Sequence, residues 1–154
     1  MHIRKAEPAE SDPLSVTAYA SKAHWGYASA VLESWRHDLL VSADSIARHP
    51  TFVCELQGDL AGFYQLILDE GECSLEHLWV HPLFMGQGVG RSLLAHAVEQ
   101  AAHCGAKHVV IDADPNAERF YLACGAVRCG AVPAPIEGEP ERVRPQLQIT
   151  LADR

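Results

Sequence analysis

The chain lacks a surplus of basic charge. It carries 12 lysines and arginines against 20 aspartates and glutamates, which gives a formal net charge of −8 with histidine neutral. Because nucleic-acid binding depends on cations that neutralise phosphates, this balance argues against DNA or RNA as a partner. The negative field is better suited to a cationic small molecule.

Long hydrophobic runs are also missing. No stretch approaches the ~18 consecutive apolar residues of a membrane span, and the opening "MHIRKAEPAESDP" contains no apolar signal core. We therefore expect neither membrane insertion nor export, and we expect a soluble protein.

Paired cysteines and paired metal ligands are scarce as well. The five cysteines are odd in number and form no CxxC pair, which is typical of a reducing cytoplasm. His77 and His81 are four residues apart, and on a strand that rises ~3.3 Å per residue they would lie ~13 Å from each other. That separation is too large for one ion, so we expect no metal site.

The chain does have a clear succession of periodic segments. Its 154 residues, 48% of them hydrophobic, suit a single domain over residues 1–154. Period-two runs predict strands at 2–6, 51–56, 60–68, 73–80, 107–114, 126–132 and 142–151. Period-3.6 runs predict helices at 13–25, 27–40, 88–104 and 115–125, with caps at Ser11 and Asp12 and a short capped turn at 42–49. This order predicts an α/β domain with a mixed sheet, in which 107–114 runs parallel to 73–80. We also expect 73–80 to splay from that parallel strand, where its free backbone groups could bind a ligand.

Three glycines stand at the mouth of the helix at 88–104, in "HPLFMGQGVGRSLL". Gly86, Gly88 and Gly90 leave the backbone N–H groups uncovered, and a helix N-terminus adds about half a positive charge. The stretch therefore suits a phosphate or pyrophosphate. A P-loop would need a lysine that is missing, whereas a Rossmann fingerprint would need glycine where Arg91 stands, although Asp112 imitates its ribose-binding acid. A plain tight loop under a core helix remains open.

Two segments carry a family resemblance. "LWVHPLFMGQGVGRSLL" resembles motif A of the GNAT N-acetyltransferase superfamily, whose loop pattern is [RQ]xxGx[GA], and "DADPNAERFYLACGAVRCG" resembles its second signature. Gly88 and Gly90 match the loop pattern, while Met85 departs from its first position. The resemblance covers nearly the whole chain and implies the GNAT acyl-CoA N-acyltransferase fold, a mixed, mostly antiparallel central sheet flanked by helices.

The resemblance also implies acetyl-CoA as co-substrate, without a metal. Its pyrophosphate would bind chiefly to backbone amides of the glycine loop, so binding should tolerate Met85 with a lower affinity. The Leu78 N–H would donate to the acetyl oxygen, and Val80 and Asn116 would contact the pantetheine arm. The implied cofactor-binding residues are Leu78, Val80, Met85, Gly86, Gln87, Gly88, Val89, Gly90, Arg91, Ser92, Asn116 and Tyr121. Asn116 could alternatively serve only as a helix cap.

Two residues are candidates for catalysis. Glu76 matches the family position of a general base, acting directly or through water, although it could position the amine or be a plain exposed glutamate. Strand alternation places Ser74, Glu76, Leu78 and Val80 on one side and Cys73, Leu75, His77 and Trp79 on the other. We therefore expect His77, the alternative base, to be packed and hydrogen-bonded. Tyr121 matches the tyrosine that donates a proton to the departing thiolate, or it is an ordinary core aromatic.

The acceptor groove of the family involves the region between the first two helices and the loop between the last two strands. Here Trp25 and Tyr27 could form an apolar or cation-binding wall, or they could fill the core. Glu137, Glu139 and Glu141 could attract a cation, or they are solvated. The leading hypothesis is an N-acetyltransferase that moves acetyl directly to a small-molecule or peptide amine in a ternary complex. The alternative is an acyl-CoA-binding regulatory module without turnover, and a homodimer would be common among similar proteins.

Overall fold

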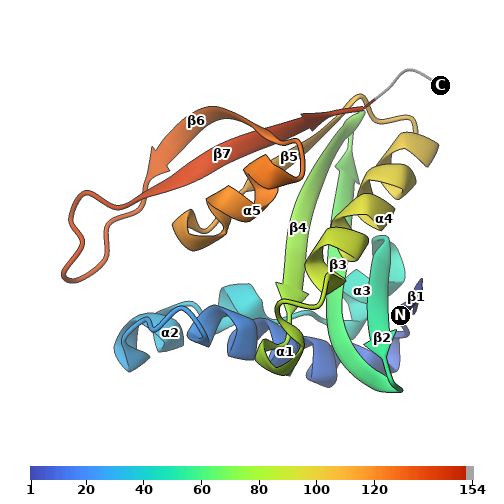
Figure 1. Cartoon of the computed structure of the whole chain (residues 1–154), viewed down its shortest axis with the longest axis horizontal. Helices are drawn as coiled ribbons and strands as arrows, with labels where there is room; N and C mark the ends of the chain where they lie inside the picture. Colours follow the sequence, from blue (N-terminus) through green and yellow to red (C-terminus); the bar gives the residue numbers. More distant parts are fainter. Residues whose placement is uncertain (152–154) are drawn as a thin grey trace.

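A seven-stranded sheet forms the centre of the molecule in the computed structural model, which describes residues 1–151 (Figure 1). The strand order is β1-β2-β3-β4-β5-β7-β6, and every neighbouring pair is antiparallel except β4 and β5. The strands are β1 (His2–Lys5), β2 (Thr51–Leu56), β3 (Asp59–Asp69), β4 (Glu72–Val80), β5 (His108–Asp112), β6 (Val127–Pro133) and β7 (Val143–Thr150). The expected mixed, mostly antiparallel sheet is confirmed, including the parallel pairing of β4 with β5.

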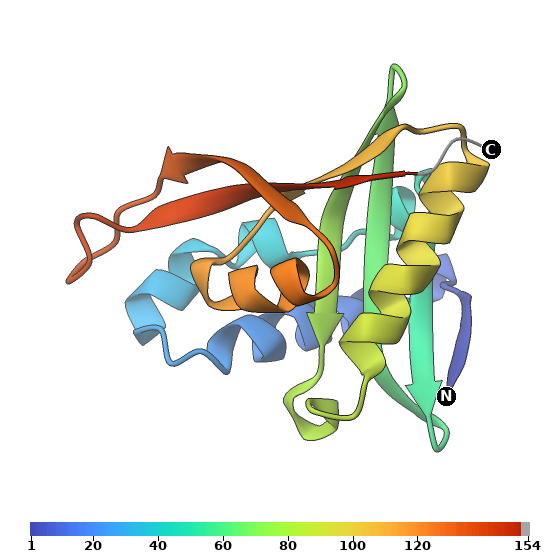
Figure 2. The same cartoon turned by 45° about the horizontal axis from the view of Figure 1, so that its top comes forward.

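Helices cover both faces of this sheet (Figures 1 and 2). The longer ones are α1 (Ser11–Ala23) and α4 (Val89–His103), and the shorter ones are α2 (Ser29–Ser34), α3 (Ala43–Arg48) and α5 (Glu118–Ala123). Single 3₁₀ turns complete the chain at η1 (Pro8–Glu10), η2 (His37–Leu39), η3 (Pro82–Phe84) and η4 (Pro115–Ala117). The core on the α4 side includes Leu93, and that on the α1 and α3 side includes Leu14 and Ile46. No helix in residues 1–151 is long and apolar enough to cross a bilayer.

The helical prediction for residues 27–40 is wrong in extent. The chain forms α2, leaves the α-helix at Trp35, and continues into η2. Tertiary packing explains the break, because Trp35 packs against Tyr27 with ring centroids 4.8 Å apart while Leu39 enters the core at 5% exposure. Residues 42–49, expected as a turn, form α3, whose cap Ser42 accepts from the Ser45 amide at 3.0 Å. The expected caps of α1, Ser11 and Asp12, lie inside that helix, because the 3₁₀ turn η1 runs directly into it.

A β-bulge in β4 corrects the expected alternation of side chains. Gln65 of β3 pairs with His77 and Leu66 pairs with Leu75, so Glu76 has no partner on β3. The extra residue reverses the facing of everything that follows it. As a result Leu75 packs into the same core as Leu78, on the α4 side, and Leu75 therefore does not share a face with His77.

After two paired residues, β4 and β5 separate. Their register comprises only Cys73 with Val109 and Ser74 with Val110, and β5 then follows β7 away from β4 (Figures 1 and 2). The expected splay is confirmed. It leaves one edge of β4, from Leu75 to Val80, without a strand neighbour on that side, and a cavity lies in this gap.

His77 is packed and hydrogen-bonded, as expected. Its side chain is 7% exposed, its Nδ1 accepts a hydrogen bond from Trp79 Nε1 at 2.9 Å, and its ring lies 6.0 Å from that of Phe63. Burial lowers the pKa of His77 to about 4, so the ring is neutral at physiological pH. His77 does not line the cavity on the other face of β4, and this placement argues against it as the catalytic base.

A buried neutral histidine makes stability depend on pH. The unfolded chain takes up this proton near pH 6.5 and the folded chain only near pH 4, so acid favours unfolding. We expect His77 to remove about 3 kcal/mol of the free energy of unfolding between pH 7 and pH 4. Urea unfolding of the wild type and of His77→Gln across this range gives the free energy of unfolding at each pH, and the slopes of this free energy against pH are compared. The exposed His37, changed to Gln, serves as control, and equal slopes for wild type and His77→Gln would contradict the assignment.

Candidate active site

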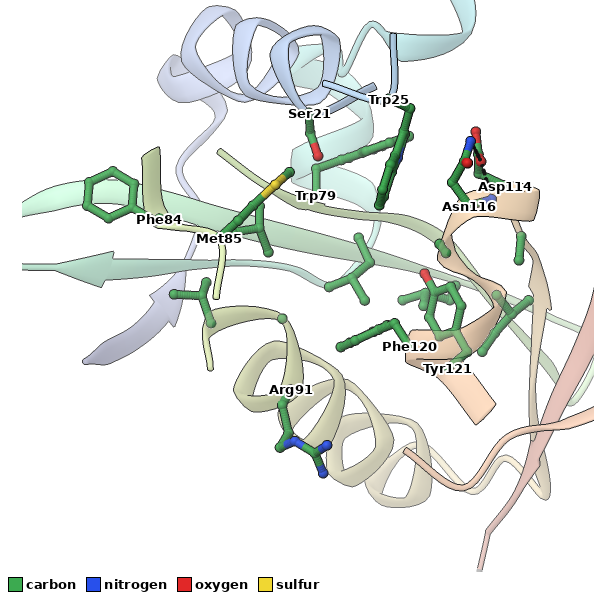
Figure 3. A pocket seen from close by; sticks show the side chains of 18 of the residues that line it. Ser21, Trp25, Trp79, Phe84, Met85, Arg91, Asp114, Asn116, Phe120 and Tyr121 are labelled. Carbon is green, nitrogen blue, oxygen red and sulfur yellow. Dashed lines mark hydrogen bonds between the residues drawn. The ribbon is translucent and has the colours of Figure 1, made fainter. Parts of the chain in front are cut away.

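A cavity of about 530 Å³ occupies the gap between β4 and β5 (Figure 3). Its wall combines the exposed stretch of β4, the loop and first turn of α4, the end of β5, and η4 with α5. The lining side chains are Ser21, Trp25, Leu75, Glu76, Leu78, Trp79, Val80, Phe84, Met85, Val89, Arg91, Ile111, Asp112, Ala113, Asp114, Asn116, Ala117, Phe120 and Tyr121, together with Gly86, Gly88 and Gly90. Segments far apart in the sequence thus meet in one concave site.

The glycine loop lines this cavity with Gly86, Gly88 and Gly90. None of the backbone N–H groups from Gly86 to Arg91 donates a hydrogen bond within residues 1–151. Gly88 is the N-cap of α4 with φ +83°, a left-handed conformation that side chains other than glycine rarely adopt. A Cβ built on Gly86 or Gly88 meets no atom within 4 Å, so the space above the loop is open. Free amides at a helix N-terminus form an anion site.

Gly90 has a different role from its two neighbours in the loop. A Cβ at this position would lie 3.3 Å from the ring of Phe120 and 3.5 Å from Val80. The absent side chain therefore allows the first turn of α4 to approach α5 and β4 closely. This contact fixes the distance between the glycine loop and the catalytic candidate on α5, Tyr121.

Most of the expected cofactor-binding residues line the cavity, but Gln87 and Ser92 do not. The Ser92 amide donates to Gly88 O at 3.1 Å as part of α4, and the Gln87 side chain donates to Leu83 O at 3.5 Å. Met85, where the chain departs from the family pattern, borders the cavity at the end of η3. The assignment of all these residues to cofactor binding stays a prediction.

Glu76 and Tyr121 both line the cavity. Glu76 is the exposed bulge residue of β4, while Tyr121 lies on α5 with 7% exposure and directs its hydroxyl toward the cavity (Figure 3). That hydroxyl forms no hydrogen bond within the described residues. Burial raises the pKa of Tyr121, so the hydroxyl keeps its proton and can act as a donor.

A polar cluster adjoins the cavity, in which Lys22, Asp114 and Arg142 are largely buried and Asn116 is exposed. We call Lys22, Tyr27, Asp114, Asn116 and Arg142 the Asp114 cluster, after its only carboxylate. Asp114 forms an ion pair with Lys22 and accepts from the Tyr27 hydroxyl at 2.8 Å. Tyr27 in turn accepts from Asn116 Nδ2 and from Arg142, each at 3.1 Å. The cluster thereby joins α1, the α1–α2 connection, η4 and the start of β7.

Charge and burial oppose each other in the Asp114 cluster. Burial alone would raise the pKa of Asp114, but the charge and hydrogen bond of Lys22 outweigh it and the pKa lies below its ordinary value. Burial lowers the pKa of Lys22, against the attraction of Asp114, and burial raises the pKa of Tyr27 to about 12. Asp114 also caps η4, because its Oδ1 accepts from the Asn116 amide at 2.7 Å. The cap expected at Asn116 is therefore supplied by Asp114.

A second cavity of about 390 Å³ adjoins the first. The α1–α2 connection, η4 and the β6–β7 loop form its walls, and Trp25 and Asn116 line both cavities. Trp25 is 42% exposed and Tyr27 is half-buried, so Trp25 does not fill the core and Tyr27 does so only in part. Glu137 and Glu139 border this second cavity from the loop.

No local pattern in the sequence pointed to Lys22, Asp114 or Arg142. Lys22 and Asp114 are 92 positions apart, and Arg142 is 115 positions from Tyr27. No spacing rule links residues over such distances, so only the folded chain brings them together. Within residues 1–151 no group of three or more histidine, cysteine, aspartate or glutamate side chains is arranged to hold a metal ion, and all five cysteines are free thiols.

Comparison with known proteins agrees with this geometry. Residues 17–126 match the model of the acetyltransferase (GNAT) family. A 74-residue segment is 34% identical to an L-amino acid N-acyltransferase, MnaT, of Escherichia coli, covering 45% of this chain and 42% of that protein, so the chain matches less than half the length of this relative.

Two solved structures share the fold over almost the whole chain. A PaiA N-acetyltransferase from Thermoplasma acidophilum in complex with coenzyme A has a TM-score of 0.78 at 17% identity, covering 97% of this chain and 98% of that one. The YncA putative acetyltransferase of Salmonella typhimurium with acetyl-CoA has a TM-score of 0.73 at 19% identity, covering 100% and 95%. The family model matches well over half of the residues of this chain. The chain therefore belongs to the GNAT acetyltransferase family.

Proposed function

We propose that this protein is an acetyl-CoA-dependent N-acetyltransferase that transfers acetyl directly to an amine. The observation that carries the proposal is the row of free amides from Gly86 to Arg91, which opens into the same cavity as Glu76 and Tyr121. The open space at Gly86 and Gly88 supports the fit of a pyrophosphate. Acetyl-CoA supplies the activated acetyl thioester.

Each chemical requirement of the transfer has a candidate group in the cavity. Glu76 accepts the proton of the acceptor ammonium, directly or through water, and so frees the amine as nucleophile. The Leu78 N–H donates to the acetyl oxygen as negative charge develops there. The new C–N bond forms as the C–S bond breaks, and Tyr121 donates a proton to the departing sulfur. No cysteine is needed as a covalent carrier, which supports direct transfer.

A small molecule is the acceptor that we favour. The two cavities meet at Trp25 and Asn116, and such a pocket suits a compact ligand. The partly matching relative is named for its action on L-amino acids. An acyl-CoA-binding module without turnover is the alternative, and incubation with acetyl-CoA and an amine panel, followed by free thiol, distinguishes the two. If no amine in the panel causes thiol release although acetyl-CoA binds tightly, the module is favoured.

Gly88→Val should weaken acetyl-CoA binding about 10- to 100-fold, the range expected when hydrogen bonds to a charged group are lost. The β-branched side chain would disturb the left-handed N-cap and enter the open space above the loop. Isothermal titration calorimetry measures the affinity. Gly58→Val, in the β2–β3 turn with φ +84°, is the matched control for backbone strain. Affinity equal to wild type in Gly88→Val would count against the loop assignment.

Tyr121→Phe should lower kcat about 100-fold, because proton donation to the leaving thiolate is lost. The affinity for acetyl-CoA should stay near that of the wild type, since the ring remains. Steady-state kinetics by thiol release, with calorimetry on the same protein, separates the two effects. Tyr19→Phe, outside both cavities, is the control, and an unchanged kcat in Tyr121→Phe would remove this hydroxyl from the mechanism.

Glu76→Gln should flatten the acidic limb of the pH–rate profile, because the amide cannot accept the proton of the acceptor. The profile of kcat/KM from pH 5 to pH 10 is the measurement. Glu72→Gln, exposed at the start of the same strand, provides the control. If Glu76→Gln keeps the wild-type profile and loses only affinity for the amine, Glu76 positions the acceptor.

A further inference from the structure

Arg142 stands out among the residues that the proposed reaction does not use. Its guanidinium borders the second cavity, yet its side chain is only 5% exposed. We propose that the second cavity binds a carboxylate of the acceptor through Arg142, so that the enzyme acetylates amines that also carry a carboxylate. This inference rests on the proposed function, because it assigns the acceptor of that reaction.

The guanidinium is held in place before any ligand arrives. Its Cζ lies 5.4 Å from the ring centroid of Tyr27 and 5.2 Å from that of Trp35. It donates to Ala134 O at 3.0 Å and to the Tyr27 hydroxyl at 3.1 Å. These are two bonds from a group with five N–H donors, so donors remain for a ligand at the cavity wall. A planar, stacked guanidinium suits a carboxylate.

The balance of buried charge also favours an anion. Two cations, Lys22 and Arg142, share the single carboxylate of Asp114, which is in direct contact with Lys22 and 3.8 Å from Arg142. Burial and Asp114 have the largest effects on the pKa of Lys22. The positive charge of Arg142 comes next and lowers that pKa. A ligand carboxylate would supply the missing negative charge where water is largely excluded.

Two glutamates on the rim suggest the opposite choice, a cationic ligand. Glu137 and Glu139 border the same cavity, but both are exposed on the β6–β7 loop. Solvent and salt screen exposed charges far more than a buried guanidinium. The buried group therefore dominates at the cavity wall, and the acidic rim is left to contact water or other polar parts of the acceptor.

The two cavities lie side by side, as an acceptor that enters both would require. Trp25 and Asn116 line both, and Asn116 bonds to the Tyr27 hydroxyl that also accepts from Arg142. An acceptor can therefore place its amine beside Glu76 and its carboxylate beside Arg142. The Asp114 cluster would then act on specificity, through Arg142, as well as on the position of η4.

Acid and amide forms of one amine test the inference in the wild-type protein. L-Leucine and L-methionine are compared with L-leucinamide and L-methioninamide by kcat/KM, from thiol release. We expect each acid to exceed its amide by about 10- to 100-fold, the range for hydrogen bonds to charged groups. Equal values, or a preference for the amides, would overturn the proposal without touching the proposed transfer reaction.

Substitutions at Arg142 test whether this residue causes the preference for the acid. Arg142→Gln should bring the ratio of kcat/KM for each acid to that for its amide close to one, and Arg142→Lys should retain part of the wild-type ratio. Arg128→Gln on β6, outside both cavities, is the matched control for loss of one arginine. If the Arg142→Gln protein is as stable as the wild type and still prefers the acid to the same extent, the assignment is overturned.

A binding measurement needs no turnover. N-acetyl-L-leucine and N-acetyl-L-leucinamide, titrated by calorimetry into the protein saturated with coenzyme A, report the carboxylate contact directly. Binding of the acid alone, lost in Arg142→Gln, supports the site even if no amine releases thiol, and in that case only the proposed reaction fails. No binding of the acid, or equal binding of both, overturns the inference.

Discussion

The site depends on one local constraint, the way in which β4 stops pairing with β5 after Ser74 and bulges at Glu76. The separation of the strands opens the cavity, and the bulge turns Leu78 and Val80 toward it while His77 is packed on the opposite face. A regular strand would have filled the gap with hydrogen bonds or turned the wrong side chains inward. The glycine loop follows directly at the end of this strand, so strand geometry also sets the direction of α4.

The buried Asp114 cluster is the second device that holds the site together. Buried ions are costly, and one carboxylate between two cations is tolerable only because aromatic rings and hydroxyl donors surround it. The cluster joins elements from both halves of the chain and positions η4, which precedes α5 and Tyr121. A network of this kind resists rearrangement, and within it two cations, Lys22 and Arg142, face one carboxylate.

Much of the fold was predictable because local periodicity and punctuation agreed. The apolar stripe of α4 between Gly88 and Gly105, and the turn residues between β2, β3 and β4, set these elements with little competition. Prediction was wrong where packing overruled the local pattern, as at Trp35, which leaves the helix and packs edge to face against Tyr27. It was also wrong in β4, because one inserted residue reverses a period of two and no residue type marks the bulge.

By itself the sequence determined the family signatures, the glycine loop, and the candidates Glu76, Tyr121, Trp25 and Tyr27, since each belongs to a short pattern whose geometry is local. Only the tertiary structure decided which face of β4 meets the cavity, that Asp114 caps η4, and that Lys22 and Arg142 share its carboxylate. The physical reason is range. The hydrogen bonds of a helix and its caps act within a few residues, whereas desolvated charges find partners across the whole chain, and no local spacing predicts their pairing.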